Sequence, residues 1–115
     1  WTTNAHIPES FEIVRHWGFE YKTLLTWVKD RMGLGDWLRG KTEHCLMAVK
    51  GSPTVVLTNQ TTALGGSLRE HSRKPDEFYT LVEALCPGSK VELFSRMERE
   101  GWQTHGNQTR LFSTL

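Results

Sequence analysis

The stretch that decides the fold of this chain reads Phe19-Glu20-Tyr21-Lys22-Thr23-Leu24-Leu25-Thr26-Trp27-Val28-Lys29. Its side chains alternate, so the odd positions from Phe19 to Trp27 would share one face of an extended chain. Aromatic residues and threonine are also typical of strands. We therefore predict a strand from Phe19 to Val28 that delivers Lys29 at its carboxyl end.

The segments around this strand predict both helix and strand. Before it, apolar residues recur at helical spacing from Ile7, Pro8 suits a first turn and Gly18 suits a stop, which predicts a helix over residues 8–17. After it, a glycine-rich loop over residues 32–40 leads to a second predicted strand, Glu43–Val49, and residues 54–57 predict a third, shorter one.

The remaining residues predict a loop, a helix and a strand. Residues 58–72 are polar and contain glycine, which indicates a surface loop. A helix begins at Lys74-Pro75-Asp76-Glu77 and ends at Pro87-Gly88, and Lys90–Ser95 predicts a buried strand. The order of elements predicts an α/β fold in a single domain over residues 1–115, with a mostly parallel sheet and flanking helices.

Composition limits the classes of function. The chain is 37% hydrophobic and 23% charged, which is typical of a globular domain. Because 13 Asp and Glu nearly balance the charge of 14 Lys and Arg, any basic surface must be local. Two cysteines, Cys45 and Cys86, favour a reduced, cytoplasmic protein, and no apolar run reaches the roughly 20 residues of a membrane helix. The five histidines show no metal-ligand spacing, so we expect no metal site.

Polar side chains at the predicted strand ends are the first candidate site, because α/β sheets bind ligands beyond those ends. They are Lys29, Ser95-Arg96 and Thr3-Asn4, although a solvated strand end would carry the same residue types. Trp1-Thr2-Thr3-Asn4 is itself more typical of a strand end than of a natural start, so we expect a segment upstream.

Charged and aromatic residues suggest further contacts, each with a simpler alternative. Arg73 and Lys74 precede a helix, where an anion would offset their unfavourable position, but Asp76 and Glu77 would do the same. Glu43 would suit the amino group of a base, and tryptophans would suit stacking or the core. Cations in the loops would contact phosphates or only water: Arg31, Arg39, Lys41, Arg69, Arg73 and Lys74.

Three segments together carry a resemblance to a known family. They are Trp27-Val28-Lys29; Gly40-Lys41-Thr42-Glu43-His44-Cys45-Leu46 with Val49-Lys50-Gly51-Ser52-Pro53; and Lys74-Pro75-Asp76-Glu77-Phe78-Tyr79 followed by Pro87-Gly88, Glu92-Leu93-Phe94-Ser95-Arg96, Trp102 and Gly106-Asn107-Gln108. In this order, over nearly the whole chain, they resemble the MT-A family of adenine-N-methyltransferases. That family includes messenger-RNA adenosine methyltransferases and bacterial and phage enzymes.

The resemblance implies a Rossmann-like, S-adenosylmethionine-dependent methyltransferase fold with permuted strand order, of which this chain is the later portion. It implies methyl transfer to the exocyclic amine of adenine, with DNA placed ahead of RNA, and it leaves a dimer or a paired subunit open. By resemblance, the residues that contact S-adenosylmethionine are Lys74, Phe94, Arg96, Asn107 and Gln108. The loop after Arg96, Met97-Glu98-Arg99-Glu100-Gly101, departs from the eukaryotic relatives, and we add Glu98 to the cofactor contacts as an acceptor for ribose hydroxyls. By the same resemblance, Trp27, Lys29 and Glu43 line the side of the target adenosine.

One departure from the family limits this expectation. The family's catalytic Asp-Pro-Pro-Trp motif does not occur in the 115 residues, so we expect no catalytic residue in this chain and no turnover by it alone. Two alternatives therefore stay beside the enzyme: a non-catalytic nucleic-acid-binding relative or partner subunit, and a plain α/β domain whose similarity has decayed.

Overall fold

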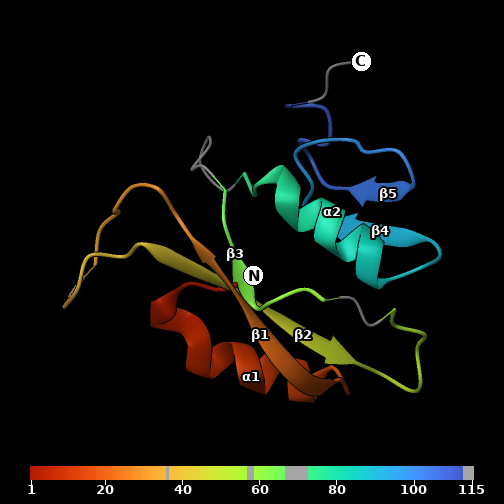
Figure 1. Cartoon of the computed structure of the whole chain (residues 1–115), viewed down its shortest axis with the longest axis horizontal. Coiled ribbons are helices and arrows are strands. Elements are labelled where there is room, and N and C mark those ends of the chain that lie inside the picture. The colour runs from red at the N-terminus through yellow and green to blue at the C-terminus, as the bar shows by residue number, and fades with distance from the viewer. Residues whose placement is uncertain (36, 57–58, 67–72, 113–115) are drawn as a thin grey trace.

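The computed structural model describes residues 1–35, 37–56, 59–66 and 73–112. Its elements follow in the order η1 (Asn4–His6), α1 (Ile7–His16), β1 (Glu20–Val28), β2 (Thr42–Val49), β3 (Ala63–Leu64), α2 (Asp76–Leu85), β4 (Lys90–Leu93) and β5 (Trp102–His105) (Figure 1). Both predicted helices and the strands at β1, β2 and β4 are confirmed. The α/β class is confirmed as well.

The strands form two small sheets, one mixed and one parallel, and not the single, mostly parallel sheet that we predicted. One sheet has the order β2-β1-β3 and the other pairs β4 with β5. β1 pairs with β2 in antiparallel fashion, from Glu20 opposite Val49 to Val28 opposite Thr42, whereas β1–β3 and β4–β5 are parallel. The physical reason is the connection over residues 29–41, which returns the chain directly beside β1 without the crossover that a parallel pair requires.

A β-bulge at Lys22 changes which side chains share a face of β1. Tyr21 pairs with Ala48 and Thr23 pairs with Met47. Two consecutive residues of β2 therefore pair with residues that are two apart on β1. The predicted common face of the odd residues is therefore wrong. Tyr21 meets Phe11 of α1 at 4.9 Å between ring centroids, whereas Trp27, beyond the bulge, meets Trp1 at 6.1 Å.

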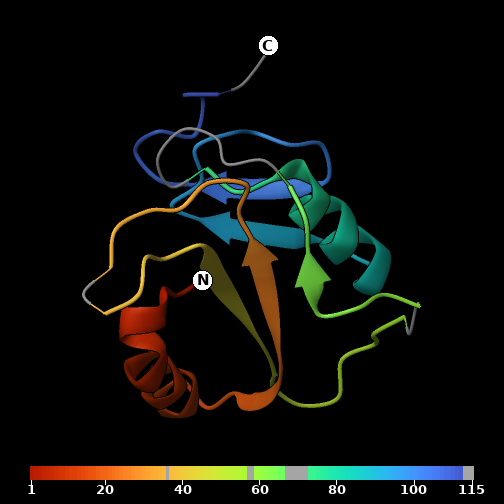
Figure 2. The ribbon, with the colours of Figure 1, turned by 60° about the vertical axis from the view of Figure 1, so that its left-hand side comes forward.

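The two helices lie in different layers. α1 packs on β1 and η1 on β2, whereas α2 lies with β4 and β5 in a separate layer (Figure 1). Figure 2 shows the arrowheads of β1 and β3 pointing toward this second layer. The carboxyl ends of both strands therefore face α2.

The core is small within the described residues. Its buried hydrophobic side chains are Trp27, Leu64 and Tyr79, and Pro75 and Ser95 are also fully buried. Tyr79 packs on Trp102 with the ring centroids 5.4 Å apart, and its hydroxyl donates to Glu92. Burial and this hydrogen bond raise the pKa of Tyr79, so it stays neutral as part of the core.

Several local predictions need correction. Residues 54–56 form no strand, and Leu57 lies outside the described residues. The predicted loop over residues 58–72 contains β3, while 58 and 67–72 also lie outside the described residues. β4 is half-exposed rather than buried, because it belongs to a two-stranded sheet, and β5 was not predicted. Across the described part of the chain, no helix has the length and apolarity to span a membrane.

Candidate functional site

A carboxylate shared by two lysines lies where β1, β2 and the start of α2 meet. Glu43 accepts from Lys29 Nζ at 3.0 Å on one oxygen and from Lys74 Nζ at 2.5 Å on the other. Glu43 stands opposite Trp27 in the β1–β2 ladder, and the Lys29 amide donates to Lys41. The ladder thus positions Lys29 and Glu43, and Lys74 directly precedes Pro75, the N-cap residue of α2.

The Glu43 cluster, meaning Lys29, Glu43 and Lys74, is partly withdrawn from water. The side chains of Glu43 and Lys74 are 13% and 15% exposed. Burial alone would raise the pKa of Glu43, but hydrogen bonds and charge from Lys74 and Lys29 outweigh it, so the pKa lies below its usual value. Glu43 is therefore ionised at neutral pH, and the cluster carries one excess positive charge.

Two tryptophans lie against the ammonium groups of this cluster. Lys29 Nζ lies 5.2 Å from the ring centroid of Trp27, and Lys74 Nζ lies 5.0 Å from that of Trp1. Trp27 is 1% exposed and donates to the Gly66 carbonyl at 2.9 Å. Trp27 is thus a core residue in this structure, and its direct contact with a substrate base stays a prediction.

The other predicted cofactor residues follow β4 and β5. Because Leu93 pairs with His105 in parallel, the two strands end side by side (Figure 2). Phe94 has φ +59°, an uncommon conformation for an aromatic residue, and its side chain is 88% exposed. Asn107 and Gln108 are exposed just after β5. The exposed ring of Phe94 and the side-chain amides of Asn107 and Gln108 therefore lie at the same edge of the β4–β5 sheet.

The loop after β4 is held at several points. The Ser95 amide donates to His105, and the buried Ser95 hydroxyl donates to the Met97 carbonyl. Arg99 forms two hydrogen bonds with Glu83 of α2, at 2.8 and 2.9 Å, and Trp102 Nε1 donates to Glu83 at 2.8 Å. Hydrogen bonds from Arg99 and Trp102 lower the pKa of Glu83 to about 2. The loop that carries the predicted contacts Arg96 and Glu98 is thus fixed to α2.

An aromatic contact joins the two groups of predicted cofactor residues. The guanidinium carbons of Arg73 and Arg96 lie 4.4 and 5.0 Å from the ring centroid of Phe112. Arg73 directly precedes Lys74 of the Glu43 cluster. The structure therefore links the start of α2 with the loop after β4.

The remaining sequence candidates are exposed in loops or have contacts of their own. Trp37, in the loop between β1 and β2, is 97% exposed. The same loop carries three exposed cations, Arg31, Arg39 and Lys41. Arg69 lies outside the described residues. Asn4 bonds with His44 at 2.7 Å and with Thr42, so it tethers η1 to β2. Glu98 contacts Arg110 at 3.3 Å.

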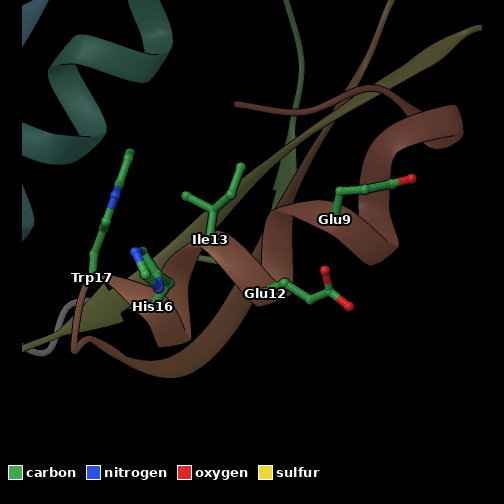
Figure 3. A pocket seen from close by; sticks show the side chains of 5 residues that line it. All are labelled: Glu9, Glu12, Ile13, His16 and Trp17. Atoms are coloured by element: carbon green, nitrogen blue, oxygen red, sulfur yellow. The ribbon is translucent and has the colours of Figure 1, made fainter.

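The exposed side of α1 carries a shallow depression that contains none of the predicted site residues. Figure 3 shows its lining along one side of the helix: Glu9, Glu12, Ile13, His16 and Trp17. We place the candidate site at the Glu43 cluster and the strand ends, because charge and aromatic groups converge there. Among the described residues, His, Cys, Asp and Glu form no group of three that could hold a metal ion.

Sequence reasoning found the charged members of the site but not the contacts that connect them. It missed Phe112, and it missed the bonds of Arg99 and Trp102 with Glu83. The only local signal was Trp102 among the segments of the family resemblance. Phe112 lies beyond those segments, so no pattern in the sequence indicated it.

Fold and site together define an α/β domain with a charged, aromatic candidate site at its strand ends. Comparison with known proteins then gives its family. The chain belongs to the MT-A70 family, whose profile matches residues 1–108. The resemblance stated from the sequence is thereby confirmed.

Similar proteins occur in plants, animals and bacteria. The chain is 40% identical over 119 residues to a putative N(6)-adenosine-methyltransferase MT-A70-like protein of Medicago truncatula, covering 94% of this chain and 19% of that protein. It is 37% identical to the human N(6)-adenosine-methyltransferase catalytic subunit METTL3, covering 94% and 21%. It is 33% identical to the type II methyltransferase M.MunI of a Mycoplasma species, covering 92% and 47%. The chain thus spans about a fifth of the plant and human relatives.

Proposed function

We propose that the protein carrying this chain transfers a methyl group from S-adenosylmethionine to the exocyclic amine of adenine in a nucleic acid. The observation that carries the proposal is the joining of the Glu43 cluster to the ends of β4 and β5 through Arg73, Phe112 and Arg96. The names of the relatives, which are adenosine or type II methyltransferases, agree with it.

The side chains at the strand ends have the chemistry that S-adenosylmethionine requires. Lys74 and Arg96 offer cationic donors for its carboxylate, the exposed ring of Phe94 offers a stacking face, and Glu98, Asn107 and Gln108 offer partners for hydroxyls and adenine. The bound cofactor would supply an electrophilic methyl group. We therefore propose the six residues as the cofactor site of a Rossmann-like methyltransferase domain.

Glu43, Lys29 and Trp27 would hold the target base. The amine of adenine is a poor nucleophile because its lone pair is delocalised into the ring, so the protein must position it and stabilise charge. The ionised Glu43 offers an acceptor for an amine hydrogen, while Lys29 and Trp27 bound the same space. The Asp-Pro-Pro-Trp motif does not occur in these 115 residues, so we expect this chain alone to give no turnover.

We propose DNA as the first substrate and RNA as the alternative, and a cytoplasmic location for the protein. A dimer or a paired subunit stays open. Titration calorimetry of S-adenosylmethionine into the full-length protein that carries this chain tests the cofactor site. We expect Lys74→Ala and Asn107→Ala to weaken binding about 10-fold or more, as for a lost charge-assisted or buried hydrogen bond. Lys22→Ala is the control, because its exposed ion pair with Glu20 lies on β1 near α1.

Methyl transfer is measured on single-stranded DNA and RNA of one sequence, with and without adenine. Methylation of an adenine-containing strand supports the proposal, and comparison of the two polymers decides between DNA and RNA. A protein that binds no S-adenosylmethionine and methylates neither polymer would overturn it. Cofactor binding without methylation would indicate a non-catalytic relative.

A further inference from the structure

We propose that Phe112 is a positioning residue of the cofactor site, whose ring holds the guanidinium groups of Arg73 and Arg96 together. This inference rests on the proposed function and extends it to a residue beyond the segments of family resemblance. It assigns the residues after β5 a role in binding affinity rather than in the chemistry of methyl transfer.

Three segments distant in sequence meet at this ring. Arg73 precedes α2, Arg96 follows β4 and Phe112 follows β5. The guanidinium carbons lie 4.4 and 5.0 Å from the ring centroid, within the roughly 6 Å typical of a cation–π contact. All three side chains are only partly exposed, and such contacts are stronger where water is excluded.

A second bond ties Phe112 to Arg96. The amide of Phe112 donates to the carbonyl of Arg96 at 2.9 Å. The backbone bond fixes Phe112 against the loop after β4, while the ring orients the guanidinium groups. The turn over residues 108–111 supports this position, because the Leu111 amide donates to Gln108 at 3.0 Å.

The ring has a physical task because the two groups carry the same charge. Like charges close together repel, and the positive end of the α2 dipole adds to this. The negative face of an aromatic ring attracts both cations, which an aliphatic side chain of similar size does not do. Replacing the ring should therefore let Arg96 move, although the volume is largely kept.

Arg96 is a proposed cofactor contact and Arg73 is the neighbour of another, Lys74. Loss of the Phe112 contact should therefore weaken S-adenosylmethionine binding without changing the groups that face the adenine. We expect a higher KM for S-adenosylmethionine and a nearly unchanged kcat. Loss of a contact that only maintained the fold would instead lower kcat and the thermal stability and leave the KM for S-adenosylmethionine nearly unchanged.

The test replaces Phe112 in the full-length protein with phenylalanines carrying one, two and three fluorines. Fluorine weakens the negative face of the ring while adding little volume. We expect the affinity for S-adenosylmethionine to fall stepwise, by roughly 3- to 30-fold for the trifluoro ring, and to fall likewise in Phe112→Leu. Phe112→Trp should keep the affinity, because tryptophan binds cations best. Fluorination of Phe11, which packs on Tyr21 of β1, is the control.

A measurement without cofactor completes the test. The Nε–H proton signals of Arg73 and Arg96 should show a ring-current shift in the wild type that disappears in Phe112→Leu. Absence of that shift, or an affinity that falls in Phe112→Leu but is unaffected by fluorination, would overturn the role of the ring. A wild type that shows the shift but binds no S-adenosylmethionine would instead overturn the proposed function and, with it, the role in cofactor binding.

Discussion

At the scale of single residues, Glu43 is the centre of the candidate site. One carboxylate balances two ammonium groups, and each oxygen serves one of them. Removing that charge would leave Lys29 and Lys74 close together and largely shielded from water, which costs more than the loss of an exposed ion pair. The cluster therefore contributes to stability, apart from its proposed role in ligand binding.

We expect Glu43→Gln to lower the free energy of unfolding by about 1–3 kcal/mol at pH 7. The folded state lowers the pKa of Glu43 from its ordinary value of 4.5, so this contribution is fully present above that pH and is lost as the pH falls through the lower folded value. Urea unfolding of both proteins between pH 7 and pH 3 should show the difference shrinking below about pH 4.5. Glu20→Gln, which removes an exposed pair with Lys22, is the control, and a difference independent of pH would contradict the prediction.

The sequence predicted the charged residues of this site because their chemistry is visible in their type. Lys29, Glu43 and Lys74 were each proposed as contacts, and the structure brings all three together. It could not predict the neighbours that position them. Trp27 was proposed to line the site of the target adenosine. Its burial became visible only from its contacts with Trp1 and Gly66 in the folded chain.

At the scale of elements, two tight turns at the ends of β4 and β5 place the proposed cofactor residues. Gly106 has φ +145°, and a Cβ there would lie 3.0 Å from Cα of Phe94. Phe94 itself has φ +59°. The close approach of these two backbones holds an uncommon conformation at the site, as is frequent at functional positions.

Gly106→Ala should therefore displace Phe94 and weaken S-adenosylmethionine binding by about 10-fold or more, because backbone atoms cannot yield as side chains do. Calorimetric titration of the full-length variant measures this. The matched control is Gly101→Ala, which also has a positive φ, +84°, but nothing within 4 Å of the added methyl. Both variants should lose stability from the strained φ, and equal cofactor affinity in the two would refute the role of the close approach.

The elements that sequence patterns missed are those with little pattern to show. β3 has two residues, Ala63–Leu64, and its position beside β1 depends on a pairing across more than 35 positions in sequence. β5 reads Trp102-Gln103-Thr104-His105, which is too short and polar to stand out. The direction of pairing between β1 and β2 was also predicted wrongly, because their hydrophobic pattern fits parallel and antiparallel pairing equally well.

At the scale of the whole molecule, a net charge of +1 gives no general attraction to a polyanion. The cations are instead local. The loop between β1 and β2 leaves directly from Lys29 and carries exposed Arg31, Arg39 and Lys41 beside the exposed Trp37. This loop is therefore the best-placed basic surface next to the Glu43 cluster for a nucleic-acid strand.

Removing one of these charges should change the salt dependence of nucleic-acid binding. For Arg31→Ala or Lys41→Ala we expect the slope of log K against log salt concentration to fall by about 0.7 to 0.9, the value for one phosphate contact. Fluorescence anisotropy between about 50 and 300 mM salt, over which the screening of charges increases, provides the slopes. Lys22→Ala should leave the slope unchanged, and equal slopes for all variants would rule out the loop as the phosphate-binding surface.

The bulge in β1 has a consequence for how the chain tolerates changes in length. Because Lys22 is the extra residue, deleting it would restore a regular pleat and leave Tyr21 opposite Ala48 and Trp27 opposite Glu43, so both side chains would keep their faces. The same deletion farther along, between Thr23 and Trp27, would invert the aromatic side chain on which the candidate site is built. Deletion of one residue therefore leaves the candidate site in place at Lys22 and disrupts it between Thr23 and Trp27.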